Sequence, residues 1–213
     1  ADAARVLNYR RPVSADKNSL INLGGNARYI YFGGQPLGHF VTASAGLSKK
    51  IGLCEIGGRL DFERRTYVAA NYFDATIPWA GLTYGCQSDK FVYGLGLRYG
   101  YDKPDSLRPG GDTTRLEGNA FVRGMFNSNL AYSILIYAAE YRDQKGFSEI
   151  INNNANRHIH RFGQRLELQY ALPKMGPNWS AQLELENSKD DSNLPLARID
   201  GQQVWLGLRY QLF

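Results

Sequence analysis

The strongest constraint on the fold is the alternation of residue types over the last ten positions, Val204 to Phe213. The even positions there are apolar, and the odd ones up to 211, apart from Trp205, are small or polar. Successive side chains of a strand point to opposite faces of a sheet, so this segment predicts a strand with one apolar face. A similar segment, Gly-Leu-Gly-Leu-Arg-Tyr-Gly-Tyr, recurs at 94–101. The chain therefore uses this kind of strand more than once.

Composition indicates which kind of membrane-spanning segment this chain can form. The chain has 213 residues, enough for one domain, and contains 23 Gly, 14 Tyr and 10 Phe, residue types that membrane barrels use heavily. No apolar stretch approaches the roughly 20 residues of a membrane-spanning helix. A membrane-spanning helix is therefore excluded. Spanning strands need only alternate residues to be apolar, so the sequence is compatible with a membrane barrel.

The net charge of +5 does not predict a nucleic-acid partner. The 25 basic residues interleave with 20 acidic ones instead of forming a basic patch. The two strands that combine aromatic residues with arginine lack the motif of an RNA-stacking sheet. We therefore expect no nucleic acid among the partners.

Ten segments alternate over a length suited to a tilted membrane crossing. We expect strands at 22–33, 39–50, 53–66, 75–86, 90–102, 113–126, 130–143, 160–173, 178–188 and 201–213. Tight turns are expected at 49–52, 87–89, 127–129 and 173–177. The other connections are longer and rich in Gly, Asn, Asp and Pro, as at 102–112, 144–159 and 189–200. Short turns at one rim and long loops at the other are typical of an antiparallel up-and-down transmembrane β-barrel, an all-β fold, with the short turns in the periplasm.

The two faces of these strands differ sharply in charge. One face carries no Lys, Arg, Asp or Glu and includes Ile56, Leu60, Phe62, Tyr93, Leu95, Leu97, Tyr99, Phe162, Leu166, Leu168, Tyr170, Leu172, Trp179, Ala181, Leu183 and Leu185. The other face is predicted to line the lumen and carries Arg28, Glu55, Arg59, Asp61, Glu63, Arg98, Glu117, Arg123, Arg165, Glu167, Glu184, Glu186 and Arg209. A charge facing lipid costs about 2–4 kcal/mol near the bilayer midplane, whereas opposite charges inside a barrel can pair. We therefore expect ion pairs between the arginines and the carboxylates of this face, with Arg59, Arg98, Arg165 and Arg209 pairing with Asp61, Glu117, Glu167 and Glu184 or their neighbours. A soluble β-sandwich, the alternative fold, would bury the apolar face and leave the charges in water.

The C-terminal strand and its repeat resemble the integral barrels of Gram-negative outer membranes, whose last strand typically ends in Tyr-x-Phe or Tyr-x-Trp and is read by the barrel-assembly machinery. Here Tyr210 and Leu212 keep that parity and Phe213 follows, so these three residues form the expected assembly signal. The segment 190–196, Asp-Asp-Ser-Asn-Leu-Pro-Leu, resembles the last loop of barrels attached to tetratricopeptide-repeat export proteins, as in polysaccharide secretion and surface-lipoprotein assembly. Both resemblances imply architecture and name no substrate.

The two cysteines, Cys54 and Cys86, test the topology. They lack C-x-x-C spacing and supply too few ligands for a metal site, so we expect no metal and no other cofactor. A hairpin centred on Ala70 places residue 54 opposite residue 86 on the same face. We therefore predict a disulfide, kept oxidised in a compartment such as the periplasm. Two buried free thiols are the alternative.

An enzyme is the less favoured interpretation. His39, His158 and His160 are expected at the long-loop rim, with Ser148 and Glu149 nearby, so a nucleophile, a base and an acid could assemble into a lipid or protein hydrolase or an acyltransferase. No G-x-S-x-G elbow accompanies them. Rim histidines are more often surface residues, and we expect no catalytic residues.

The N-terminal segment 1–17 lacks clean alternation and predicts a linker or plug ahead of a barrel over 18–213. With ten strands, an even number, both termini lie in the periplasm and the long loops lie outside the cell. If Val6 to Tyr9 pairs as a strand, twelve strands would keep the number even.

Two functions fit such a barrel. About eight to ten strands leave an interior that side chains nearly fill. The first function is a narrow conduit whose arginine-rich wall eases the export or passage of small anions or an acidic polymer. The second is a structural anchor whose loops or N-terminal segment bind a periplasmic or secretion partner. The other expected partners are outer-membrane lipid and the barrel-assembly machinery.

Overall fold

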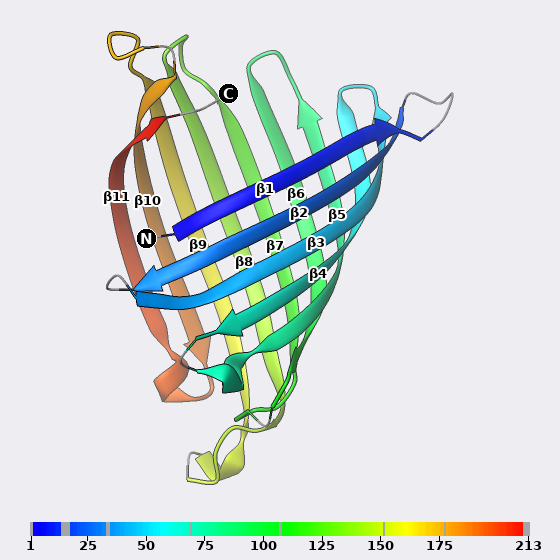
Figure 1. The fold of residues 1–213 in the computed structure, drawn as a ribbon, viewed down its shortest axis with the longest axis vertical. Coiled ribbons are helices and arrows are strands. Elements are labelled where there is room, and N and C mark those ends of the chain that lie inside the picture. The colour runs from blue at the N-terminus through cyan, green and yellow to red at the C-terminus, as the bar shows by residue number, and fades with distance from the viewer. Residues whose placement is uncertain are drawn as a thin grey trace.

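The computed structural model in Figure 1 describes residues 2–13, 18–32, 35–68, 70–106, 108–150, 152–176 and 178–210. Eleven strands form one antiparallel sheet in which each strand pairs with its neighbours in sequence. They are β1 (Asp2–Pro12), β2 (Ser19–Phe32), β3 (Gln35–Ile51), β4 (Cys54–Tyr67), β5 (Ala75–Gln87), β6 (Phe91–Pro104), β7 (Thr113–Met125), β8 (Leu130–Gly146), β9 (Asn156–Ala171), β10 (Trp179–Ser192) and β11 (Ile199–Tyr210). Three one-turn 3-10 helices, η1 (Asn71–Phe73), η2 (Asn152–Asn154) and η3 (Pro195–Ala197), lie in the connections. No helix in these ranges is long and apolar enough to cross a membrane.

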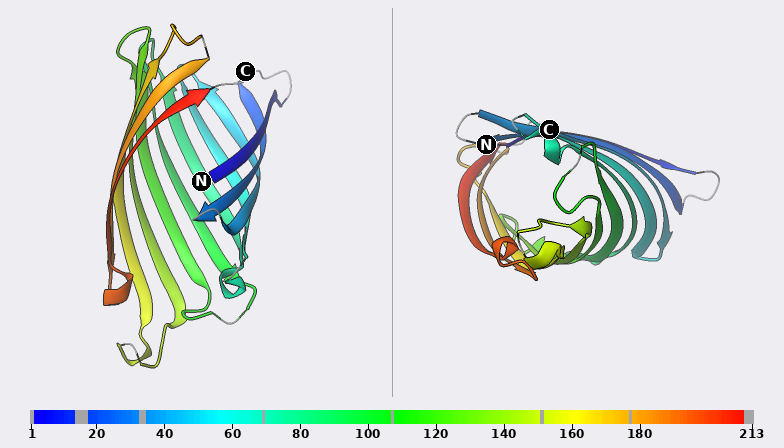
Figure 2. Two further views of the ribbon diagram at one scale, coloured as in Figure 1. Left: turned by 60° about the vertical axis from the view of Figure 1, so that its left-hand side comes forward. Right: turned by 90° about the horizontal axis from the view of Figure 1, so that it is seen from below.

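The ten predicted strands all form, as β2 to β11, and the all-β up-and-down architecture is confirmed. The sheet twists strongly, so that β1 to β3 cross at a slant in front of β8 to β11 (Figure 1). Seen from below, the strands curve around an enclosed space (Figure 2). Strands β1 and β11 are the two edges, and over the described residues they are not paired with each other.

The prediction for the N-terminal segment was wrong, because Asp2–Pro12 is a wall strand and not a linker or plug. It pairs with β2 along its whole length, from Asp2 opposite Ile30 to Pro12 opposite Leu20. Backbone hydrogen bonds make this ladder, so it forms without an alternating side-chain pattern. The strand count is therefore eleven instead of ten or twelve.

The added strand also changes where the ends of the described chain lie. Strand β1 begins beside the end of β2, at the rim that carries the longer loops, whereas β11 ends beside Trp179 at the short-turn rim. With an odd number of strands the two ends fall at opposite rims, so the prediction that both termini share the periplasmic side does not hold for Asp2 and Tyr210. Residues 211–213, which include two residues of the expected assembly signal, Leu212 and Phe213, lie outside the described ranges.

The predicted difference between the rims is present in part, since β3 begins soon after β2 at the long-loop rim and the connection 172–178 at the short-turn rim is longer than the tight turn expected there. Residues 52–53, 88–90 and 126–129 make short connections at one rim. The opposite rim, at the bottom of Figure 1, carries the connections 105–112, 147–155 and 193–198.

The hairpin of β4 and β5 has the predicted register. Cys54 lies directly opposite Cys86 in the ladder, and the two are joined by a disulfide. The alternative of two free thiols is therefore excluded, and the hairpin is centred on Ala70, as expected.

Candidate functional site

The two faces of the sheet have the character that the sequence predicts. Apolar side chains of the outward face are widely exposed, with Leu60 65% and Leu97 52% accessible. Ile77 and Trp79, on the opposite face of β5, are buried. This arrangement is the reverse of a soluble sandwich, which would bury its apolar face.

The charged side chains predicted to line the lumen share the other face, and several form ion pairs within a strand or between neighbouring strands. Arg98 Nε donates to Glu117 Oε2 at 2.7 Å, and its guanidinium lies 4.1 Å from the ring centroid of Trp79. Arg59 Nε lies 2.5 Å from Asp61 Oδ1. These contacts allow Arg59 and Arg98 to lie close to other charges on this face, because each of the two arginines has a carboxylate partner.

The same pattern continues in β9 and β10. Arg165 contacts both Glu186, at 2.6 Å, and Glu184, at 3.3 Å. Glu167 accepts a hydrogen bond from Gln182 Nε2 at 2.7 Å instead of pairing with an arginine. The pairing expected for Arg59, Arg98 and Arg165 is thus present in the structure.

Two more of the predicted carboxylates have partners that the sequence did not suggest. Glu55 of β4 pairs with Arg10 of β1, and the strands β2 and β3 lie between them in the sheet. Glu63 pairs with Arg65 at 2.5 Å and accepts a hydrogen bond from the buried indole of Trp79 at 3.2 Å. The first contact spans β2 and β3 along one face of the sheet, so β1 contributes charge to the same face as β4.

A second charged cluster, not predicted from the sequence, lies where β6, β7 and β8 reach the long-loop rim. Asp102, only 1% exposed, contacts Arg108 at 3.1 Å and also pairs with Arg115. Asp143 is likewise buried and pairs with Arg157 at 3.0 Å. Buried charges of this kind are stable only when paired, so this cluster fixes the loop that supplies Arg108.

That loop, residues 105–112 between β6 and β7, turns into the enclosed space (Figure 2). Its Gly110 donates a backbone hydrogen bond to Gly146 at 3.2 Å and accepts one from Lys145 at 3.0 Å. The sequence contained a partial signal for this cluster, since Asp102 and Asp143 continue the charged face of their strands. The path of the loop itself was not predictable.

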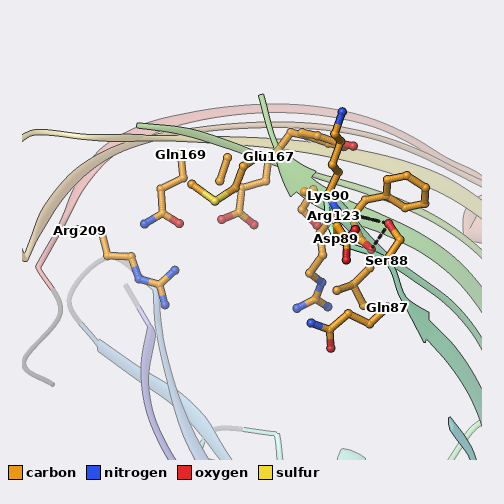
Figure 3. Close-up of a pocket in the computed structure, with 15 residues that line it drawn as sticks. Gln87, Ser88, Asp89, Lys90, Arg123, Glu167, Gln169 and Arg209 are labelled. Atoms are coloured by element: carbon orange, nitrogen blue, oxygen red, sulfur yellow. Dashed lines mark hydrogen bonds between the residues drawn. The ribbon is translucent and has the colours of Figure 1, made fainter. Parts of the chain in front are cut away.

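The short-turn rim is more open and contains a cavity of about 560 Å³ (Figure 3). Figure 3 shows Arg209 reaching into it from β11, opposite Arg123 of β7, with Glu167 and Gln169 of β9 between them. Over the described residues, neither Arg123 nor Arg209 makes an ion pair; Arg123 instead lies 4.7 Å from the ring centroid of Phe121. The pairing expected for Arg209 is therefore not found, and both arginines face this cavity.

The three histidines do not form one site. His39 lies on β3 beside Tyr29, with ring centroids 6.1 Å apart. His158 and His160 lie on β9 next to Glu140 of β8, and His158 Nε2 is 2.7 Å from Glu140 Oε1. In the described part of the chain no hydrogen bond joins a histidine to Ser148 or Glu149, so the nucleophile, base and acid of a hydrolase are not brought together.

No protein-family model matches the chain, and no curated protein matches it. Among solved structures it is similar to a chain of the FpvAI–pyocin S2 complex, with a TM-score of 0.55 and 8% identity. It is also similar to the copper transporter OprC, with a TM-score of 0.42 and 12% identity. These likenesses cover 100% and 96% of this chain but 40% of each of the other chains, so the chain spans two-fifths of their length. The first likeness supports the fold alone, an all-β wall of antiparallel up-and-down strands.

Proposed function

We propose that this chain forms the wall of a barrel in the bacterial outer membrane and acts as a narrow conduit for small anions or an acidic polymer. The observation that carries the proposal is the cavity at the short-turn rim, where Arg123 and Arg209 face the enclosed space without carboxylate partners among the described residues. Cations lining a narrow passage lower the barrier for anions.

The outward face supports the proposed location. Its exposed leucines and tyrosines suit hydrocarbon and its interfaces, while the charges expected in the lumen lie on the opposite face and the outward pair of Arg142 and Glu140 lies near the long-loop rim. We propose that the short turns face the periplasm and the long loops face the cell exterior. The partners of this arrangement are outer-membrane lipid and, during insertion, the barrel-assembly machinery.

The inward loop 105–112 makes the long-loop rim the narrow end of the conduit. Arg108 and Asp102 hold it against the wall, and the charged residues around it are paired. Ions entering from the short-turn rim would therefore first meet a cavity lined by three cations and two carboxylates, and afterwards a packed constriction; the five charged residues are Lys90, Arg123, Arg209, Asp89 and Glu167.

The proposal is tested in planar bilayers by measuring the reversal potential across a salt gradient. Arg123→Ala combined with Arg209→Ala should shift selectivity away from anions while the protein still folds, because lumen substitutions tune selectivity more than stability. Arg142→Ala, a control on the outer face, should leave the reversal potential unchanged. An unchanged anion preference in the double variant would contradict the proposal.

A structural anchor is the second candidate, favoured by the buried ion pairs that pack the long-loop rim. If neither the wild type nor Arg108→Ala, which loosens the loop, conducts ions in planar bilayers, that result would support the anchor over the conduit. In that case the loops 147–155 and 193–198 are the proposed contact sites for a secretion partner, in line with the resemblance of the last loop to export barrels.

A further inference from the structure

Three side chains near the long-loop rim converge on the outer face of β8 and β9. His158 and His160 are two positions apart on β9, so they point to the same side of the strand. Glu140 lies directly opposite His160 in the ladder. One ligand atom of each residue lies within 4.8 Å of the other two. Ile136 and Phe162, which share this side of the strands, are exposed, so the cluster stands just beyond the apolar surface.

We propose that Glu140, His158 and His160 bind a divalent transition-metal ion, such as Zn²⁺ or Cu²⁺. Two imidazoles and a carboxylate are ligands that these ions accept, and three protein ligands leave a position open for water. This site differs from the expectation of no metal, because the two cysteines supply too few ligands whereas the histidines meet Glu140 through the pairing of β8 with β9.

The observed spacing is close to what one ion needs. Ligand atoms that each lie about 2.1 Å from a common ion are separated by at most about 4.2 Å. The three atoms lie within 4.8 Å of one another, so small side-chain rotations would bring them into range. His158 Nε2 and Glu140 Oε1, at 2.7 Å, are already close enough to share one ion.

The backbone around the cluster is held in place. The His158 amide donates to Asn193 Oδ1 at 2.8 Å, and its carbonyl accepts from Ser192 Oγ at 2.8 Å. His160 is paired with strands on both sides, opposite Glu140 and Asp191. Ligands fixed in this way lose little freedom when an ion binds.

Arg142 competes with the ion. Its Nε lies 2.6 Å from Glu140 Oε1, so its positive charge occupies the same carboxylate. The Arg142 side chain is 63% exposed and can turn into solvent when a metal arrives. Because the Arg142 guanidinium must be displaced from Glu140 before the ion binds, it lowers the affinity for the metal. Replacing Arg142 should therefore raise that affinity.

A bound ion would join β8 and β9 just before their ladder becomes irregular. The register shifts between Arg142 and Gly146, and the loop 147–155 follows. Metal binding should therefore protect this loop from proteolysis as well as hold the two strands together.

The test uses the full chain in detergent with Zn²⁺ alone, measured by isothermal titration calorimetry. We expect one ion per chain, with affinity about tenfold or more weaker after His160→Ala or Glu140→Gln, and stronger after Arg142→Ala. The control is His39→Ala, which removes the one remaining histidine and should leave the affinity unchanged.

A second readout is the Cu²⁺ electron paramagnetic resonance spectrum. Two nitrogen donors should appear in the wild type and one in His160→Ala, with the His39→Ala spectrum equal to that of the wild type. Equal affinities in the wild type and His160→Ala, or the same loss in His39→Ala, would overturn the proposal. If His160→Ala does not fold, the Glu140→Gln and Arg142→Ala affinities decide, because their shifts are expected in opposite directions.

Discussion

Single residues on the two faces of the sheet tolerate charge very differently. Leu97 is exposed near the middle of β6, whereas Gln182 of β10 lies beside Glu167 on the charged face. Leu97→Arg should lower the free energy of unfolding in detergent or lipid by about 2–4 kcal/mol, because it places a charge at lipid depth. Gln182→Arg, which adds the same charge next to a carboxylate, should cost far less. Equal costs in reversible urea unfolding would mean that Leu97 does not face lipid.

The pair of Arg64 and Asp105 at the long-loop rim gives a residue-scale test by pH. Arg64 Nη1 donates to Asp105 Oδ1 at 2.6 Å, and this hydrogen bonding holds the pKa of Asp105 below its ordinary value of 3.8. A lowered folded-state pKa stabilises the protein above the unfolded-state pKa, and that contribution is lost as pH falls through the folded-state pKa. Arg64→Gln should raise the pKa of Asp105 toward 3.8 in an NMR titration. Stability should change little, because both side chains are well exposed. A pKa unaffected by the substitution would show that the pair does not form in solution.

At the scale of elements, the disulfide ties β4 to β5. Its removal by Cys54→Ala with Cys86→Ala should lower the free energy of unfolding by about 2–4 kcal/mol, because the unfolded chain is no longer cross-linked. Mass spectrometry of unreduced peptides should find residues 54 and 86 linked, and reductant should destabilise the wild type but not the double variant. Recovery of both thiols in free form would refute the register of this hairpin.

The inward loop offers a matched pair of glycines. Gly110 and Gly52 both have positive φ, 83° and 61°, which disfavours other residues. A Cβ at Gly110 would collide with the Asp143 carboxylate, whereas one at Gly52 would meet open space. Gly110→Ala should therefore expel the loop 105–112 and speed its cleavage by protease, while Gly52→Ala should carry only the backbone cost. Equal cleavage rates in the two variants would mean that the loop is not packed against the wall.

Individual elements also show which parts of the fold and of the candidate sites the sequence predicts. The alternation through Leu95, Leu97 and Arg98 assigned faces correctly, and the positions of Cys54 and Cys86 gave the register of a hairpin, because a strand has a strict period of two. Strand β1 was predicted only as an alternative, over Val6 to Tyr9, since its ladder is made by the backbone and its arginines break the pattern. The contacts of Arg108 depend on the path of a loop, and the meeting of Glu140 with His160 depends on a pairing between strands, so neither carries a local signature.

For the molecule as a whole, the exposed apolar face requires a solvent other than water. We expect the chain to stay monodisperse only in detergent or lipid and to show a β-rich circular dichroism spectrum there. Size-exclusion chromatography with and without detergent checks this. A stable detergent-free monomer with the same spectrum would be incompatible with a membrane barrel.

The direction of the edge strands governs how the wall can close. Every neighbouring pair in the sheet is antiparallel, so β1 and β11 run the same way. A seam between them, or between β11 of one copy and β1 of another in the same orientation, would be a parallel ladder, which is slightly less stable per residue. Only an odd number of additional strands between the edges would keep the hydrogen bonding antiparallel around the full circumference. A parallel seam would be the weakest line of the cylinder, where lateral opening toward the lipid would begin.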